Sequence, residues 1–472
     1  MHCMDGLFVR RNKYEGKEQF LSLRKMLATP SARLFSKNNR IADEDLPPPP
    51  VATQSIHQAL APMLAGAQFI GLMPVCGVLA PAPHRLVFQW RTARAFYSGG
   101  VLTGLAVVTA LSCNHVTTTI KNDTDGFIKT IGSATAGAVF YGCSTLTVLL
   151  FLRLALRWPA LVTFWHKIEC DQSSMLGWPP ICWKTRFLAS VIMSLGCVEH
   201  LMSILVHVQE CLRGQHEVCS SAGDFLRLYM SRSHGFLFSS TIPYSAPLGL
   251  LVVVASELAT FGWNYCDLFV ILVGWTLAIR LRALNRHLLR QDLHLTSRTQ
   301  WGVFRSHYAA MSNLVKMVDE NVSPIILLSF SSNLYFICLQ LLNGLSPKST
   351  SALDYIYFFG SFIFLLARTI MVTLFAAQVH DESRVALPVL YNCPPQSYCV
   401  EVQRLQYQLT DDELSLTGMR FFSINRSFLL AVAGAIVTYE VILIQFSGTL
   451  TGSESHTTKA PMTTSTAPTP PL

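Results

Sequence analysis

Seven apolar segments, each long enough to cross a bilayer, constrain this chain more than any other feature of its sequence. A spanning helix needs about 20 predominantly apolar residues, and such segments recur along most of the 472 residues. Charged residues make up only 14% of the chain, against about 25% in a typical globular domain. We therefore predict an all-α polytopic membrane protein with seven transmembrane helices. They lie near residues 95–116, 127–152, 187–208, 242–279, 323–345, 353–378 and 427–448.

The distribution of basic residues sets the expected topology. The chain has 36 Lys and Arg, and most of them fall in segments that lie inside the cell if the N-terminus is cytoplasmic, in agreement with the positive-inside rule. Residues 1–54 then form a disordered, basic cytoplasmic arm, and residues 95–448 form the seven-helix subunit. Residues 449–472, rich in Ser, Thr and Pro, form a disordered extracellular tail. The basic balance belongs to membrane orientation, so no nucleic-acid partner is expected.

An eighth apolar stretch, residues 56–79, is interrupted and bordered by prolines. If it were a span, the basic residues near the N-terminus would lie outside the cell, against the positive-inside rule. We therefore expect residues 55–94 to pack under the first span as a separate segment. The sequence leaves open whether this segment is re-entrant or interfacial.

Several polar and aromatic residues fall in the predicted outward halves of the spans. Carboxylates and amides bond well to vicinal hydroxyls, and an aromatic ring packs on the C–H face of a sugar, so the mixture suits a neutral polyol. Ionisable groups inside a membrane are functional candidates because burying one unpaired is costly, although each residue can instead serve as a helix–helix contact. The candidates are Glu199, His200, Trp263, Asn264, Asp267, Tyr335, Gln340, Asn343 and Tyr355.

The last apolar segment carries polar side chains that a lipid-facing helix does not need. On a helical wheel, one stripe is mixed polar and aromatic, as the lining of a pore would be. This stripe contains Thr438, Tyr439, Ile442, Gln445 and Phe446. Glu440 points roughly away from the stripe, so we expect it to form a hydrogen bond or ion pair within its own subunit. Arg368 on the sixth span is its candidate partner.

The sequence contains no Gly-rich phosphate loop, no nucleophile elbow, no His-Glu-x-x-His and no cysteines with metal-site spacing. We therefore expect no enzymatic activity, no metal and no cofactor. Cys211 and Cys219 share a predicted outer loop, where a disulfide and two independent thiols are both open. Asn122 begins a glycosylation sequon in the first predicted outer loop.

The motif Thr438-Tyr439-Glu440, four apolar residues and Gln445-Phe446 resembles the signature that ends the last helix of insect gustatory receptors. Further stretches resemble the sugar-receptor branch of that family. They are residues 67–74, 198–200, 263–269, 333–343 and 417–422. The similarity runs from about residue 55 to residue 448.

This resemblance implies a sugar-gated, non-selective cation channel that acts as a sweet-taste receptor in the plasma membrane of sensory neurons. Four subunits, identical or related, would surround one pore lined by their last helices, in contact with membrane lipids and with Gln445 and Phe446 as its gate. A seven-helix G-protein-coupled chemoreceptor is the nearest alternative, but Asp-Arg-Tyr after the third span and Asn-Pro-x-x-Tyr in the seventh are both missing. A sugar transporter is a further alternative, without the internal repeat that many transporter folds carry.

Overall fold

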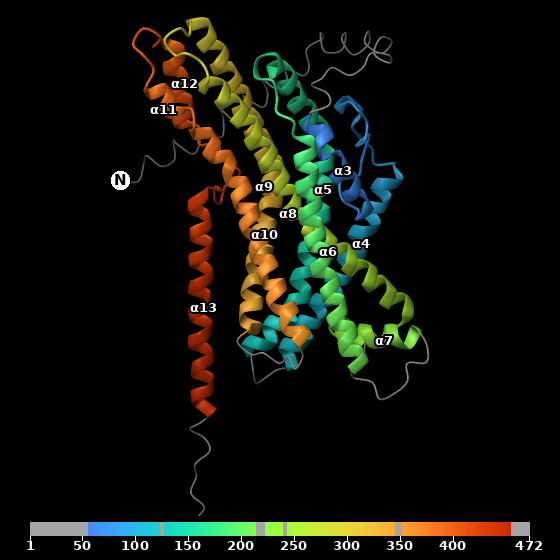
Figure 1. Ribbon diagram of the computed structural model, residues 1–472. Coiled ribbons are helices and arrows are strands. Elements are labelled where there is room, and N and C mark those ends of the chain that lie inside the picture. Colours follow the sequence, from blue (N-terminus) through green and yellow to red (C-terminus); the bar gives the residue numbers. More distant parts are fainter. Residues whose placement is uncertain (1–54, 123–126, 214–221, 239–242, 345–351, 455–472) are drawn as a thin grey trace, which may run out of the picture. The chain divides into compact units, whose positions relative to one another are not determined.

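The computed structural model describes residues 55–122, 127–213, 222–238, 243–344 and 352–454, and this part of the chain is almost entirely helical (Figure 1). The predicted arm of residues 1–54 and the tail beyond residue 454 lie outside it. Two short strands, β1 (Val75–Cys76) and β2 (Val87–Phe88), pair antiparallel. The helices are α3 (Ile56–Phe69), α4 (Ala93–Asn122), α5 (Phe127–Leu176), α6 (Cys182–Arg213), α7 (Ala222–Ser233), α8 (Ala246–Leu289), α9 (Arg298–Gly344), α10 (Ala352–Arg384), α11 (Leu387–Tyr391), α12 (Val400–Asp411) and α13 (Arg426–Glu454), with 3₁₀ turns η2 (Pro83–Arg85) and η3 (Gly235–Leu237).

Each predicted span falls largely on one long helix, and several helices continue well beyond the prediction. α5 extends to Leu176 and α9 begins at Arg298, because both keep burying large side chains there, such as Trp165 and Trp301. α13 extends to Glu454, so residues 449–454 of the predicted tail are helical.

Five helices of the described chain, α4, α5, α6, α9 and α10, are long and apolar enough to cross a membrane by length and composition. α8 and α13 carry the fourth and seventh predicted spans and are not in that group. Seven spans and their orientation therefore stay predictions.

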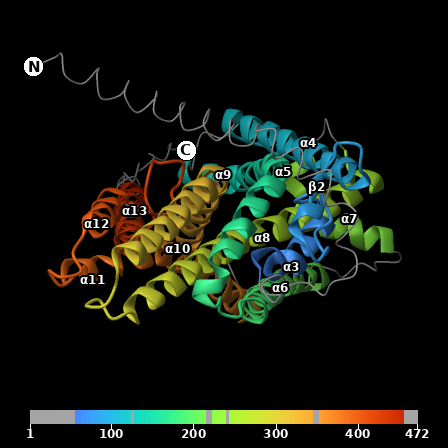
Figure 2. The same ribbon diagram turned by 90° about the horizontal axis from the view of Figure 1, so that it is seen from above.

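α8 lies between α5, α6, α9 and α10 (Figure 2), and almost every residue from Asn264 to Leu288 is buried. The approach of α10 to α8 is close enough to require glycine at Gly274. A Cβ there would lie 2.8 Å from the carbonyl oxygen of Phe375. The buried interior of the helix bundle is therefore supplied largely by one helix, α8.

Residues 55–97 form a compact layer against α5, α6 and α8. The backbone N–H of Ile56 donates to the buried carboxylate of Glu169 at 3.3 Å, and the same carboxylate pairs with Arg280 of α8 at 2.7 Å. α3 has 14 residues, fewer than the about 20 that a span needs. The location of this layer relative to a membrane stays a prediction.

α12 was not predicted from the sequence, and it packs against the N-terminal half of α9. Glu401 pairs with Arg305 at 2.6 Å, and Asp412, just after the helix, pairs with Lys316 at 2.8 Å. α12 turns an apolar face inward through Val402, Leu405 and Leu409. The sequence analysis did not predict a short amphipathic helix of this kind, because the loop that contains it has no long apolar run.

The turn that leads into α13 is fastened to α9. Thr417 donates its backbone N–H to Asp319 Oδ1 at 2.6 Å and its hydroxyl to Oδ2 at 2.8 Å. The ring of Phe422 stacks on that of Phe428, the third residue of α13, with centroids 4.6 Å apart. Gly418 is required here, because a Cβ would lie 2.3 Å from the Phe422 ring.

α13 itself buries none of the side chains that the structure describes along it. It contacts α9 and α10 (Figure 1). The half-buried side chains repeat at helical spacing on one face, at Phe428, Val432, Ile436, Tyr439 and Glu440. The other faces are open, and Leu430 and Val437 are 75% and 62% exposed.

Candidate ligand-binding cavity

A cavity of about 290 Å³ lies between α5, α6, α7, α8, α9 and α10. This volume is at the lower end of the range of about 300–1,000 Å³ that small-molecule sites occupy. Its wall mixes hydroxyl, carboxylate, amide and imidazole groups with aromatic rings. The cavity therefore fits a small ligand that offers both polar groups and an apolar face.

The structure brings several predicted candidates together at this cavity. Glu199 and His200 come from α6, Trp263 and Asn264 from α8, and Gln340 from α9. These residues are far apart in the sequence, and α8 contacts both α6 and α9.

The remaining candidates do not line the cavity. Asp267 is fully buried below it, and the hydroxyl of Tyr335 bonds instead to Thr135 Oγ1 at 2.9 Å. Asn343 and Tyr355 are exposed on α9 and α10.

A chain of polar contacts crosses the cavity from α9 to α6. Gln340 Nε2 donates to Ser361 Oγ at 3.2 Å, and Ser361 donates to Glu199 Oε1 at 2.8 Å. Gln340 Oε1 is buried and has no hydrogen-bond partner among the described residues. A buried acceptor without a partner is costly, and a ligand hydroxyl that donates to it would remove that cost.

The charges in the cavity favour a neutral ligand over an anion. His200 Nε2 lies 2.7 Å from Glu257 Oε2. On the α7 side, His234 contacts Ser233 and Ser256. Burial, and secondly the nearby His207, lower the pKa of His234 to about 4, so this ring is neutral at neutral pH. The only arginine at the cavity, within the described chain, is Arg368, which is already paired.

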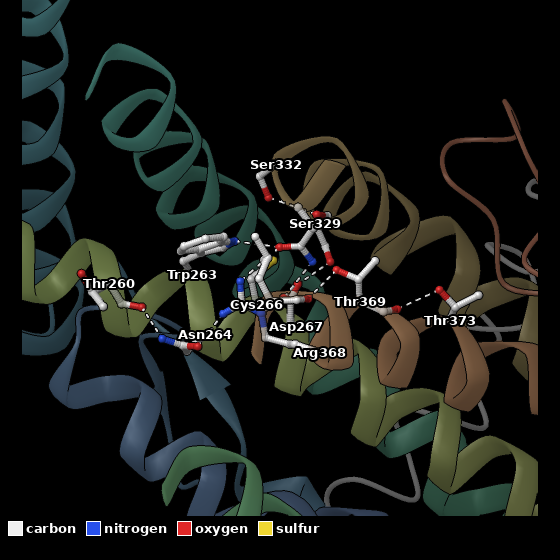
Figure 3. Close-up of polar contacts among 12 residues, drawn as sticks. Thr260, Trp263, Asn264, Cys266, Asp267, Ser329, Ser332, Arg368, Thr369 and Thr373 are labelled. Carbon is white, nitrogen blue, oxygen red and sulfur yellow. Dashed lines mark hydrogen bonds and ion pairs between the residues drawn. The ribbon is translucent and has the colours of Figure 1, made fainter. Parts of the chain in front are cut away.

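Arg368 belongs to a buried polar network under the cavity (Figure 3). Its guanidinium pairs with Asp267 at 2.7 Å and donates to Asn333 Oδ1 at 3.2 Å. It also donates to Asn264 Oδ1 and lies over the Trp263 ring, 4.2 Å from the centroid. Arg368 therefore fixes the orientation of two side chains that form the cavity floor.

The remaining acceptors of this network are also satisfied. Ser329 donates to Asp267 Oδ1 at 2.5 Å, and Asn333 Nδ2 donates to Oδ2 at 2.9 Å. Trp263 Nε1 donates to Asn333 Oδ1 at 3.1 Å. A buried charge pair is stabilising only with such additional hydrogen bonds, and here three helices supply them.

The predicted pairing of Arg368 with Glu440 is wrong. Arg368 faces α8, where Asp267 is its carboxylate partner. Glu440 does lie on the face of α13 turned toward α9 and α10, but its Oε2 is buried without a hydrogen-bond partner in the described part of the chain. The choice of partner depends on which helix α10 packs against, and the sequence does not carry that information.

Sequence reasoning missed cavity residues on α10 and around α7. Ser361 and Phe364 line the cavity along with Arg368. They lie on one helical face with Tyr357, a residue already notable in the sequence as one of the aromatic side chains at the start of the sixth span, because the four residues are spaced by three to four. Counting back from Arg368 in steps of three or four residues would therefore have identified Phe364 and Ser361 as residues on the same helical face. The α7 contribution, Tyr229 and Ser233, follows from a short helix that the sequence analysis placed in a loop.

The predicted pore stripe lies mainly on the open side of α13. Thr438, Ile442 and Gln445 are exposed, and Tyr439 is half-buried. The side chains of Phe446 and Asn122 lie outside the described residues, as does Cys219, so the gate ring, the glycosylation and the disulfide stay predictions. Cys211 is buried in α6.

Comparison with known sequences gives matches that cover most of the chain. The sequence profile described as "Trehalose receptor" matches residues 48–454. Gustatory receptor 5a for trehalose of Drosophila melanogaster is 35% identical over 395 residues, covering 83% of this chain and 85% of that protein. Gustatory receptor for sugar taste 64f of the same species is 36% identical over 400 residues, covering 83% and 81%.

Comparison with solved structures concerns the fold alone. The insect olfactory receptor OR5 from Machilis hrabei superposes with a TM-score of 0.60 at 15% identity, over 83% of this chain and 99% of that one. Its complex with eugenol gives a TM-score of 0.57 with the same coverage.

Proposed function

The chain belongs to the trehalose receptor family, within the sugar-taste branch of the gustatory receptors, and from this premise we propose that it is a sugar-gated, non-selective cation channel. It acts as a sweet-taste receptor in the plasma membrane of sensory neurons, as a homotetramer or with related subunits. The named relatives are receptors rather than enzymes, and none of these matches supports a G-protein-coupled receptor.

The observation that best supports a sugar ligand is the set of polar and aromatic groups that line the 290 Å³ cavity. Glu199 and Gln340 offer acceptors to hydroxyls, and Trp263 supplies an aromatic surface. Each hydroxyl bond contributes about 1 kcal/mol net, so a few of them give an affinity in the millimolar range. Weak binding suits a sensor of abundant nutrients.

The channel part of the proposal rests on α13. α13 has mostly apolar side chains, yet none of its described residues is buried. Contacts within its own protomer therefore leave most of its apolar surface uncovered. Four copies arranged around an axis would place the exposed Thr438, Ile442 and Gln445 toward a shared path, with Phe446 beside Gln445 at its outer end. Sugar binding would then favour the open state only through its higher affinity for that state.

Whole-cell recording of the protein expressed alone, challenged with a panel of mono- and disaccharides, tests the proposal. Gln340→Ala should raise the sugar concentration for half-maximal current about fivefold, the equivalent of one lost hydrogen bond. Asn343→Ala, an exposed amide one turn away, is the matched control and should leave it unchanged.

Gln445→Ala should raise the basal current or alter gating without changing the order of sugar preference. If Gln445→Ala changed only sugar potency, the pore assignment would be wrong. Uptake of radiolabelled sugar without any current would favour a transporter instead.

A further inference from the structure

The segment that leads into α4 and the first turn of α4 carry exposed basic and aromatic side chains that the sugar function does not use. We call this set the α4 entry surface and define it as Arg85, Trp90, Arg91, Arg94 and Phe96. All five are exposed, Trp90 and Phe96 by 60% and 70%. Such exposed aromatics belong in contact with an apolar or interfacial environment.

Within the part of the chain that the structure describes, no carboxylate compensates the charge of this surface. Residues 55–122 contain no Asp or Glu. None of its arginines has a carboxylate within 4 Å among the described residues. Glu169, the carboxylate at the base of α3, is buried and already paired with Arg280. An anionic ligand would therefore complement this surface, which the described residues leave without a carboxylate partner.

The same region is held in a fixed shape. Arg94 Nη1 donates to the carbonyl oxygen of Val75 at 3.2 Å. Tyr97 donates to the carbonyl oxygen of Phe69 at 2.7 Å, and Ser98 to that of Gly71 at 2.6 Å. The first turns of α4 are thus bonded to the layer of residues 55–97, so the backbone that carries these arginines is held in place.

The position of the surface on α4 identifies the anion. α4 is one of the helices long and apolar enough to span, so a basic cluster at its end lies at the depth of lipid headgroups. Tryptophan is enriched at that depth, and basic clusters beside spanning helices on the cytoplasmic side bind anionic headgroups. With a cytoplasmic N-terminus, the first turn of α4 lies in the inner leaflet.

We propose that the α4 entry surface binds the headgroup of an anionic phospholipid, with Arg85 and Arg91 on the phosphates and Trp90 against the first carbons of the acyl chains, next to the headgroup. A second basic and aromatic pair, Lys184 and Trp183 at the start of α6, is exposed on the helix that α3 packs against. The layer of residues 55–97 is in this view a lipid-bound support for α5 and α8.

The test measures binding of dioctanoyl phosphatidylinositol bisphosphate to the purified full-length receptor in neutral detergent, without sugar. Dioctanoyl phosphatidylcholine and free inositol trisphosphate are the comparison ligands. The double variant R85Q/R91Q should bind the anionic lipid about thirtyfold more weakly, since each basic residue near an anionic surface contributes about fivefold. R85K/R91K should retain most of the affinity.

R290Q/R298Q is the matched control, because it removes two exposed arginines from the turn between α8 and α9 and should leave binding unchanged. Trp90→Ala should weaken the lipid but not the inositol phosphate. Equal loss in R290Q/R298Q, or equal affinity for phosphatidylcholine, would overturn the proposal. So would inositol trisphosphate binding as tightly as the lipid, since the site would then take a soluble phosphate. Because no sugar or current is involved, failure here leaves the sugar-gated channel untouched.

Discussion

Replacing Arg368 by Gln probes the network under the cavity, and the structure sets the size of the effect. Arg368 and Asp267 are 2% and 0% exposed, and they pair at 2.7 Å. Removing one partner of a buried pair leaves an uncompensated charge and costs about 3–5 kcal/mol. We expect R368Q and D267N each to lower the free energy of unfolding by this amount.

The double variant D267N/R368Q separates a pair from two independent groups. It removes both charges and leaves amides that can still bond to Asn333. Its loss should be close to that of either single variant, so the coupling energy should be about as large as one single loss, about 3–5 kcal/mol. Chemical unfolding of the purified receptor, followed by tryptophan fluorescence, measures all three variants on one scale.

Glu440→Gln is the matched control, because it removes a carboxylate oxygen that has no hydrogen-bond partner among the described residues. It should cost little or nothing. Additive losses in the double variant, or a loss in E440Q equal to that of D267N, would refute the pairing. As a second readout, R368Q should raise the sugar concentration for half-maximal current, because Arg368 orients Asn264 and Trp263.

Two other contacts give separate expectations. Thr417→Val removes the hydroxyl donor to Asp319, a charged-group bond worth about 1.5–3 kcal/mol. The loosened base of α13 should raise the current without sugar, and Thr417→Ser should not; equal currents would contradict this reasoning. The pKa of His234 is about 4 in the folded protein and about 6.5 in the unfolded chain. Between these two pH values the unfolded chain binds a proton that the folded protein does not. Thermal stability should therefore fall as pH drops through that window, and less steeply in His234→Gln; parallel curves would refute it.

The helices were predictable because apolar length is a property of one segment at a time. All seven predicted spans fall largely on long helices. The ends were not predictable, since α5 and α9 continue as far as neighbouring helices bury their side chains. The length of an apolar segment predicts where a span ends, whereas the length of a helix depends on how far it packs against its neighbours. The two ends therefore need not coincide.

The cavity was predictable only in part, because periodicity gives the face of a helix but not what lies opposite. Asn264 and Asp267 share a face of α8, yet Asn264 lines the cavity while Asp267 lies in the buried network. Tyr355 and Tyr357 are two residues apart and so point to nearly opposite sides of α10. Tyr357 lines the cavity and Tyr355 is exposed.

The contrast between the two ends of the last segment explains how α13 could move as a unit. At its base, Leu416 and Ile424 are fully buried, and Phe330 of α9 contacts both stacked rings, Phe422 and Phe428. Above the base, no described side chain of α13 is buried. A helix fixed at one end and lightly packed along its length rotates about that end at less cost than it bends, because bending would break its backbone hydrogen bonds. The turn of residues 417–425 is therefore the natural pivot for any movement of α13.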